Sequence, residues 1–291
     1  MNAQNEVLLT PTSIASADFI AGMAKGMAVL ESFDTERQRL NATLAAQRAG
    51  ITRAAARRHL LTLAYLGYLE TDGSYYWLSA KVLRFSGSYL ASARLPRVLQ
   101  PTLNRLAAQT GESFSAVVLD ADQVVIVARS GNGRSRTEPA GGSKTGENYY
   151  ENSSKLGNKY ADILAYGLHL GARLPAYATS TGRVLLAALS EPEFAAWVTQ
   201  RRLYRLTSHT CTDVAELQTI IAQTRAQDYA VVHEEHELGV HALAVPLRNM
   251  QGKTVAALNV VTSSARLQPK SYQRDLLPLL QDAARELRAL V

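Results

Sequence analysis

Three arginines, Arg53, Arg57 and Arg58, lie close together in a segment whose apolar spacing predicts one helix, which begins near Thr52 and ends near Gly67. A guanidinium group can bind guanine O6 and N7 with two parallel hydrogen bonds, and it also pairs with phosphate oxygens. No aspartate or glutamate occurs from residue 37 to residue 69, whereas six arginines do. Positive charge is therefore concentrated around one helix, and this pattern favours contact with the phosphates and base edges of a nucleic acid.

The elements around this helix predict a DNA-binding motif. Residues 21–33 have helical spacing, and Asn41 can cap a second short helix that ends before Gly50. Two short helices joined by a glycine-containing turn are typical of a helix-turn-helix. Residues 68–78 predict a hairpin around an Asp-Gly turn, which makes the motif winged; the alternative is a small helical bundle that carries a hairpin. The residues expected to contact double-stranded DNA are Thr52, Arg53, Ala54, Arg57, Arg58 and His59, some of them as phosphate anchors, with the wing at 72–76 on the flanking backbone.

The composition excludes several classes of protein. With 47% hydrophobic and 19% charged residues, the 291-residue chain suits a folded protein and is long enough for two cores. Cys211 is the single cysteine, so we expect neither a disulfide framework nor a cysteine-based zinc finger. No apolar run approaches the ~18 residues of a membrane span, and the first residues do not resemble a leader peptide. We therefore expect a cytoplasmic protein that does not contact a membrane.

The chain is expected to divide into four segments. They are a flexible arm at 1–17, a winged helix-turn-helix domain at 18–79, a linker helix at 80–95 and a second domain at 96–291 with a polar insertion at about 131–159. Pro96 is expected to end the linker helix. The apolar face of this helix needs cover, which either a second copy of the chain or its own domain would supply.

The second domain has the pattern of an α+β fold around one mainly antiparallel sheet. Its short apolar segments are rich in valine, and they alternate with segments of helical spacing. Strands are predicted at 115–119, 123–128, 229–232, 242–247 and 254–262, and helices at 103–110, 181–189, 191–200, 213–227 and 270–290.

A ligand site is expected where residues 179–183 precede an apolar helix. The backbone N–H groups and hydroxyls there would hold a carboxylate, although an ordinary helix cap explains the same residues. The run 233–237 raises the question of a metal, but the spacing of zinc hydrolases is absent because His236 comes one residue too early. We expect a solvated loop or pocket wall at His233, His236 and His241, and neither a metal nor a cofactor.

Five pieces of the sequence, in order along nearly its whole length, resemble the IclR-type bacterial transcription regulators. The pieces are Phe19–Leu30, Ala56–Leu63 with Gly67–Leu69, Leu174–Arg183, Glu234–Gly239 and Ala256–Val260. The Arg-Arg-His-Leu-Leu-Thr-Leu and Leu-Pro-Ala-Tyr-Ala-Thr-Ser motifs are most similar to the branch that controls aromatic-acid catabolism, the PcaR/PobR type. The resemblance implies a winged helix-turn-helix, a linker helix used in dimerisation and a C-terminal effector-binding domain of GAF-like fold. The polar insertion departs from the family pattern, and is either a lid or subunit contact or a solvated excursion.

The resemblance also implies which residues meet the effector. Ser180 and Thr181 match an anion-binding position, and Ala242, Asn259 and Val261 match positions that line the pocket. Tyr177, Arg183 and His241 are chemically suitable neighbours for an aromatic acid of the 4-hydroxybenzoate or protocatechuate type. Val232 stands where some relatives carry an acid, which argues for a ligand different from theirs.

The expected function is a ligand-responsive regulator of aromatic-degradation genes. It would bind promoter DNA as a homodimer or homotetramer, and would change its DNA affinity or its contact with RNA polymerase when the effector binds. The alternative is an enzyme that uses the C-terminal domain, with the N-terminal module for docking. No Gly-x-Ser-x-Gly motif, P-loop or suitable Cys–His pair occurs, so no catalytic residue is assigned. An RNA-binding protein is disfavoured because the basic charge is confined to one helix region.

Overall fold

The chain forms two compact units, which divide between Ser92 and Ala93. The computed structural model describes residues 14–34, 37–131, 169–199, 201–263 and 269–291. Most of the predicted arm and nearly all of the predicted insertion therefore lie outside the described residues. We call residues 1–92 the first unit and residues 93–291 the second unit, and describe each by itself.

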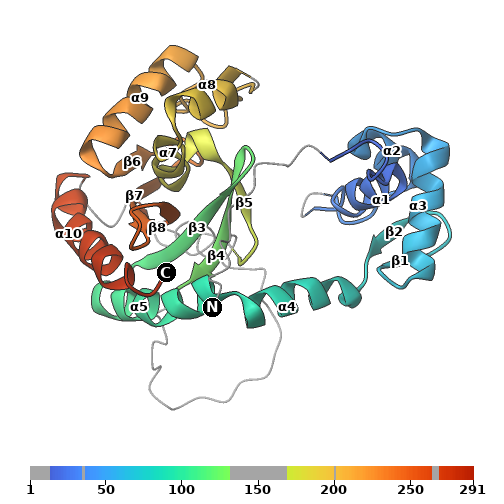
Figure 1. Ribbon diagram of the computed structural model, residues 1–291, viewed down its shortest axis with the longest axis horizontal. Helices are drawn as coiled ribbons and strands as arrows, with labels where there is room; N and C mark the ends of the chain where they lie inside the picture. Colours follow the sequence, from blue (N-terminus) through green and yellow to red (C-terminus); the bar gives the residue numbers. More distant parts are fainter. Residues whose placement is uncertain (1–13, 35–36, 132–168, 200, 264–268) are drawn as a thin grey trace, which may run out of the picture. The chain divides into compact units, whose positions relative to one another are not determined.

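The first unit contains the predicted helix-turn-helix. It is built from α1 (Ala21–Leu30), α2 (Ala42–Ala49) and α3 (Arg53–Tyr65) (Figure 1). The side-chain oxygen of Asn41 accepts hydrogen bonds from two backbone N–H groups at the start of α2, as an N-cap does. Gly50 ends α2 with a left-handed φ of 64°, which glycine adopts without a Cβ penalty. The three helices enclose a small core that includes Val29, Leu40, Ala56 and Leu60.

A two-stranded wing follows the helices. β1 (Leu69–Thr71) pairs antiparallel with β2 (Tyr76–Leu78), and Leu40 adds a bridge to Tyr76. The turn forms because Oδ1 of Asp72 accepts from the N–H groups of Ser74 and Tyr75, at 3.0 and 2.8 Å. The predicted hairpin and its Asp-Gly turn are confirmed.

The predicted linker helix is interrupted. A short 3-10 turn, η1 (Ala80–Val82), leads into α4 (Leu83–Ser92), and α5 (Arg94–Thr110) begins after the extended residue Ala93. The prediction that Pro96 ends a helix is wrong, because Pro96 is buried in the first turn of α5. A proline is tolerated there since the first N–H groups of a helix have no intrahelical acceptor.

The second unit is built on one antiparallel sheet of six strands, in the order β5-β4-β3-β8-β7-β6. The prediction of an antiparallel sheet is thereby confirmed for the described residues. The sequence did not predict its short edge strand β5. The strands are β3 (Ser113–Asp120), β4 (Gln123–Arg129), β5 (Arg173–Pro175), β6 (Ala230–His233), β7 (Val240–Arg248) and β8 (Thr254–Ser263).

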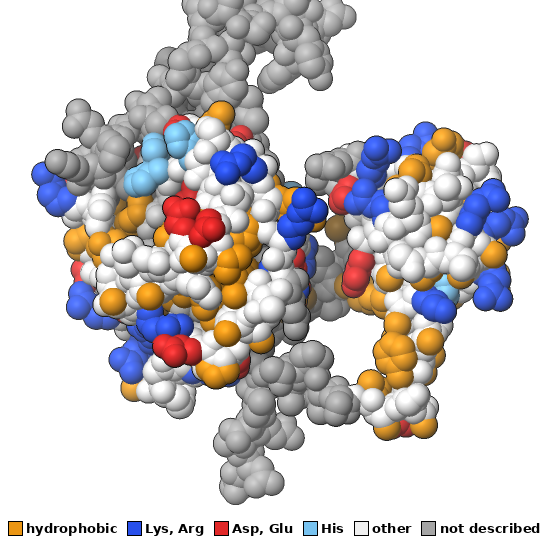
Figure 2. Space-filling view, turned by 90° about the horizontal axis from the view of Figure 1, so that it is seen from above, with side chains coloured by type: hydrophobic (Ala, Val, Ile, Leu, Met, Phe, Trp, Pro, Cys, Tyr) orange, Lys and Arg blue, Asp and Glu red, His pale blue; other side chains and the backbone are white. Residues whose placement is uncertain are grey.

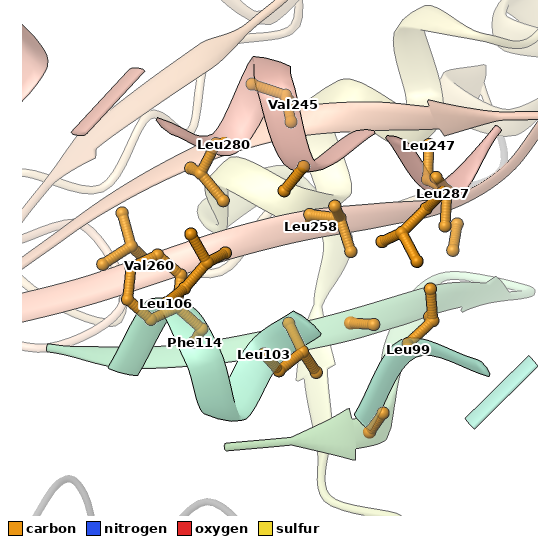
Figure 3. Packing of buried hydrophobic residues seen from close by; sticks show 14 of the residues in the cluster. Leu99, Leu103, Leu106, Phe114, Val245, Leu247, Leu258, Val260, Leu280 and Leu287 are labelled. Atoms are coloured by element: carbon orange, nitrogen blue, oxygen red, sulfur yellow. The ribbon is translucent and has the colours of Figure 1, made fainter. Parts of the chain in front are cut away.

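Helices cover both faces of this sheet (Figure 1). One face packs on α5 and α10 (Pro269–Leu287), where Leu103, Phe114, Leu258 and Leu280 belong to one continuous core (Figure 3). The other face carries the 3-10 turn η2 (Ala176–Ala178), α7 (Ser180–Ala187), α8 (Glu191–Thr199) and α9 (Val214–Gln227). Because successive strand residues point to opposite faces, register decides which side chains meet α7. Within the described residues, no helix is long and apolar enough to cross a membrane.

Candidate nucleic-acid interface and ligand site

The arginines of α3 are exposed and have no ion-pair partner among the described residues. Arg53, Arg57 and Arg58 are exposed on α3, whereas Ala56 and Leu60 of the same helix are buried. Figure 2 shows several separate groups of Lys and Arg side chains on the visible surface of the first unit. Unpaired, solvated guanidinium groups on the exposed surface of one helix can bind phosphate oxygens or guanine without first breaking another pair.

Two other arginines of the basic region are already paired. Arg39 forms an ion pair with Asp72 of the wing, and Arg48 forms one with Asp34. The guanidinium of Arg39 also lies 4.6 Å from the centre of the Trp77 ring. Arg39 therefore stabilises the wing, and the charge that remains available for DNA lies mainly on α3.

The other predicted DNA contacts of α3 lie in different surroundings. The Thr52 hydroxyl accepts a hydrogen bond from the Ala55 N–H at 3.3 Å, so it caps the helix at the predicted start. Ala54 is exposed on the arginine edge. His59 is half-buried beside α1, where a Cβ placed on Gly26 would lie 3.6 Å from its Nδ1. The structure therefore places His59 against α1, away from the edge that carries the arginines.

The predicted ligand segment forms the N-terminus of α7, which packs on β7 and β8. Thr179 is its N-cap, with a hydroxyl that accepts from the Gly182 N–H at 3.1 Å. A side chain at Gly182 would bring a Cβ within 2.0 Å of the carbonyl oxygen of Ala176, so only glycine allows this close approach of the backbones. Thr179 therefore caps α7, as the alternative of an ordinary helix cap expects.

Ser180 and Thr181, the next two residues, are buried, with 1% and 2% of their surface exposed. The Ser180 hydroxyl has no hydrogen-bond partner among the described residues. A buried polar group without a partner lowers the stability of the folded protein by about 1–3 kcal/mol. This hydroxyl is therefore the polar group at the start of α7 that most needs a hydrogen-bond partner.

The strand register brings three of the four predicted strand residues to the α7 face. Ala242 pairs with Val261 across β7 and β8, and Asn259 lies next to Ser115, whose hydroxyl donates to its Oδ1. These side chains share the face of Ala244, which belongs to the core under α7. Val232 is on the same face because it pairs with Ala242.

His241 lies on the opposite face of the sheet, because it has the same strand parity as Leu243, which packs against the α5 and α10 side. Its Nδ1 is 2.7 Å from Nδ1 of His233, its partner on β6. The expectation that His241 neighbours the ligand together with Ala242 is therefore corrected. The described residues contain no group of three or more His, Cys, Asp or Glu side chains that could hold a metal ion.

Arg183 is buried and paired with a carboxylate that the sequence analysis did not assign to it. Its Nη2 lies 2.7 Å from Oε2 of Glu235, and the two side chains are 4% and 12% exposed. Its Nε donates to the carbonyl of Tyr177 at 3.1 Å, and the same Glu235 oxygen accepts from the Cys211 N–H at 3.0 Å. The charge of Arg183 is therefore neutralised within the protein, where it joins α7 to the loop after β6.

The Tyr177 hydroxyl is likewise occupied. It donates to the carbonyl oxygen of Tyr204 at 2.7 Å and accepts from the Tyr204 N–H at 3.0 Å. Burial raises the pKa of Tyr177, so the phenol stays protonated at neutral pH. The polar groups of Tyr177 and Arg183 are therefore bound to other parts of the protein. The groups at the start of α7 that remain for a ligand are the backbone N–H groups and the Ser180 hydroxyl.

Two family descriptions match this chain. Residues 22–73 match the IclR helix-turn-helix domain, and residues 155–289 match the description "Bacterial transcriptional regulator IclR C-terminal". The first match spans α1 to the start of the wing turn. The second spans the described part of the sheet from β5 onward, with the helices α7 to α10.

Individual proteins are similar over almost the whole chain. The Pca operon regulatory protein of Acinetobacter baylyi is 46% identical over 96% of this chain and 91% of its own length. The p-hydroxybenzoate hydroxylase transcriptional activator of the same organism is 47% identical, over 100% of both chains.

Solved structures give the same likeness. A putative transcriptional regulator from Rhodococcus sp. RHA1 has 36% identity and a TM-score of 0.67, over 93% of this chain and 97% of that one. The inducer-binding domain of a double mutant of the Acinetobacter transcription factor PobR, in complex with 3-hydroxybenzoic acid, has 42% identity and a TM-score of 0.54. It covers 67% of this chain and 98% of that one.

Proposed function

Because the chain belongs to the IclR family of bacterial transcriptional regulators, we propose that it binds promoter DNA through α3 and the wing and senses a small aromatic carboxylate in its second unit. The α+β fold with an N-terminal helix-turn-helix is that of the family. The alternative of an enzyme is not supported, since the similar proteins are named as regulators. We place the protein in the cytoplasm, where promoter DNA is accessible.

The single observation that carries this function is the pairing pattern of the arginines. Within the described part of the basic region, Arg39 and Arg48 have carboxylate partners, whereas Arg53, Arg57 and Arg58 have none. An unpaired edge on the second helix of a helix-turn-helix is the surface that enters the major groove. On this basis Arg53 and Arg57 contact bases or phosphates, with Arg58 beside them.

The proposed effector site lies between the start of α7 and the sheet. Its carboxylate would meet the N–H groups at Ser180 and Thr181, where the helix dipole favours an anion. Its ring would lie over Ala242, Asn259 and Val261, which share the face under α7. The buried hydroxyl of Ser180 supports this placement, because a ligand oxygen would supply the hydrogen bond that it lacks. No cofactor or metal is needed for this binding.

The similar proteins support a class of ligand for this chain. One is named the p-hydroxybenzoate hydroxylase transcriptional activator, and the inducer-binding domain of a double mutant of Acinetobacter PobR was solved with 3-hydroxybenzoic acid. We propose a hydroxylated benzoate for this chain, with 4-hydroxybenzoate and protocatechuate as the first compounds to examine. Effector binding would then change either the affinity for the promoter or contact with RNA polymerase.

We further propose that α4 pairs with a second copy of the chain. Two of the apolar side chains on one face of α4, Phe85 and Tyr89, are 59% and 49% exposed, although the Phe85 ring also stacks on the ring of Tyr68. A two-fold dimer buries the same face from both copies, and it presents two recognition helices to a palindromic site. A homotetramer would be two such dimers.

The test of effector binding is a thermal-shift titration of the whole protein. We expect 4-hydroxybenzoate or protocatechuate to raise the unfolding temperature, because a ligand at about 100 times its dissociation constant adds ~2.7 kcal/mol of stability. Cyclohexanecarboxylate controls for the charge without the aromatic ring. Ser180→Ala should reduce the ligand-induced rise in the unfolding temperature. Ser190→Ala, which changes a serine outside the proposed site, should not reduce it. The absence of a shift with every hydroxybenzoate would contradict the proposed ligand class.

A further inference from the structure

The exposed edge of α3 continues beyond the arginines with two apolar side chains. Leu61 is 42% exposed and Tyr65 is 90% exposed. Helical periodicity places Ala54, Arg58, Leu61 and Tyr65 along one stripe, since they are spaced by four, three and four residues. A surface helix ordinarily carries polar residues on such a stripe, so the leucine and tyrosine need an explanation.

Neither side chain is needed to build the first unit. The packing of α3 is supplied by Ala56 and Leu60, which are fully buried, and by the half-buried Leu63. Among the described residues, Tyr65 makes no hydrogen bond or ring contact. The C-terminal end of α3 is capped by Lys81, whose ammonium group donates to the Leu66 carbonyl at 2.6 Å.

The length of the stripe fits the major groove of a DNA duplex. From Ala54 to Tyr65, the two ends of the stripe, the helix rises about 16.5 Å at 1.5 Å per residue. The major groove is about 12 Å wide, so a helix whose stripe enters it at Ala54 and Arg58 reaches the phosphates at the far side near Tyr65. Leu61 then lies between the two ends of the stripe, where it faces the base edges in the groove.

We propose that Leu61 and Tyr65 complete the DNA-reading surface of α3, with Leu61 against the 5-methyl group of a thymine and the Tyr65 hydroxyl donating to a phosphate oxygen. The inference rests on the proposed function, that α3 binds promoter DNA, and assigns it two neutral contacts. The positive charge on and beside the stripe, from Arg58 within it and Arg57 next to it, favours DNA over a protein partner. A protein partner would bury unpaired guanidinium groups, whereas phosphates neutralise them.

The experiment begins with selection of duplexes from a random-sequence pool by the wild-type protein. The selected duplex is then titrated with each variant by fluorescence anisotropy at several salt concentrations. For Tyr65→Phe we expect a loss of about three- to tenfold in affinity, equal on selected and unrelated duplexes, because a phosphate contact carries no sequence information. Its salt dependence should equal that of the wild type, since a neutral phenol releases no counterion.

Leu61 is tested with probes in which single thymines are replaced by deoxyuridine, which lacks the methyl group. One such replacement should weaken binding of the wild type several-fold and leave binding of Leu61→Ala unchanged. Leu66→Ala is the matched control, because Leu66 is 47% exposed at the end of α3 but lies off the stripe. It should keep the wild-type response to deoxyuridine.

The outcomes separate this inference from the proposed function. If the wild type selects no DNA, the proposed function and the inference both fail. If the wild type binds DNA, and Leu61→Ala and Tyr65→Phe bind it with unchanged affinity, the inference is overturned and the proposed function stands. A change of oligomeric state in these variants with unchanged DNA affinity would assign the stripe to a second copy of the chain, which also overturns the inference.

Discussion

The exposed arginines of α3 and the buried arginine of α7 have opposite surroundings. On α3, Arg57 and its neighbours are solvated and have no carboxylate partner among the described residues. On α7, Arg183 is enclosed and bound to Glu235, with Tyr177 and Cys211 completing the network. An arginine that is to bind an external anion must keep its charge available, whereas a buried arginine needs an internal partner to be tolerated. The comparison therefore separates the residues that are proposed to bind DNA from those that stabilise the fold.

The largest expected effect comes from breaking the buried pair. Glu235→Ala leaves the Arg183 guanidinium enclosed without its carboxylate, so we expect a loss of about 3–5 kcal/mol in the free energy of unfolding. Urea unfolding of the two proteins measures it. Glu286→Ala, which breaks the exposed pair with Arg105, is the control and should cost ~0–1 kcal/mol. Equal losses of unfolding free energy in the two variants would show that the buried pair stabilises the protein no more than the exposed pair does.

The close packing of the second unit is tested at Gly182. A Cβ there would overlap the Ala176 backbone, so Gly182→Ala should lower the free energy of unfolding by roughly 1–3 kcal/mol or more. In the first unit, Gly22 lies in α1 with open space around it, and Gly22→Ala should be neutral or slightly stabilising. Unfolding midpoints in urea compare the two. A harmless Gly182→Ala would mean that η2 and α7 can move apart.

The exposed arginines are tested on DNA. Arg57→Ala should cost ~1–3 kcal/mol of affinity for the selected duplex if Arg57 contacts a base, with little change in unfolding. If Arg57 contacts a phosphate instead, the slope of affinity against salt should fall by about one. Arg48→Ala is the matched control, because Arg48 is paired with Asp34. Unchanged affinity and salt slope in Arg57→Ala would remove this residue from the interface.

The smallest effect concerns pH. Burial lowers the pKa of His236, so the folded protein favours the neutral ring while the unfolded chain binds a proton at its ordinary pKa. Stability that depends on the neutral ring is present above the unfolded pKa of about 6.5 and is lost as the pH falls through it. The free energy of unfolding should therefore decrease more between pH 7 and pH 5 in the wild type than in His236→Gln. Parallel pH profiles would contradict this assignment.

The sequence predicted the features that depend on neighbouring residues. Asn41 and Thr52 cap their helices, and the Asp-Gly turn forms the wing, because each needs only groups two or three positions away. Pro96 was misassigned because a proline is compatible with either the end of one helix or the first turn of the next.

The interactions that sequence reasoning missed join distant parts of the chain. Glu235 is 52 residues from Arg183, and nothing local indicates that they meet. Strand alternation places His241 and Ala242 on opposite faces of the sheet. Which of the two faces α7 could be decided only once the register with β8 was known. The run of histidines raised the question of a metal site because spacing in the sequence does not show which side chains face each other in the fold.

The most direct test of the central claim measures the affinity for the selected duplex with and without saturating 4-hydroxybenzoate, and with protocatechuate in parallel. If the chain is a regulator that senses an aromatic acid, one of these ligands changes the dissociation constant for the duplex by about 5- to 150-fold, the usual range of coupling between two sites. Cyclohexanecarboxylate should have no effect. A dissociation constant that is the same with and without a hydroxybenzoate, in protein whose thermal shift proves that the ligand is bound, would contradict the claim that the second unit controls DNA affinity.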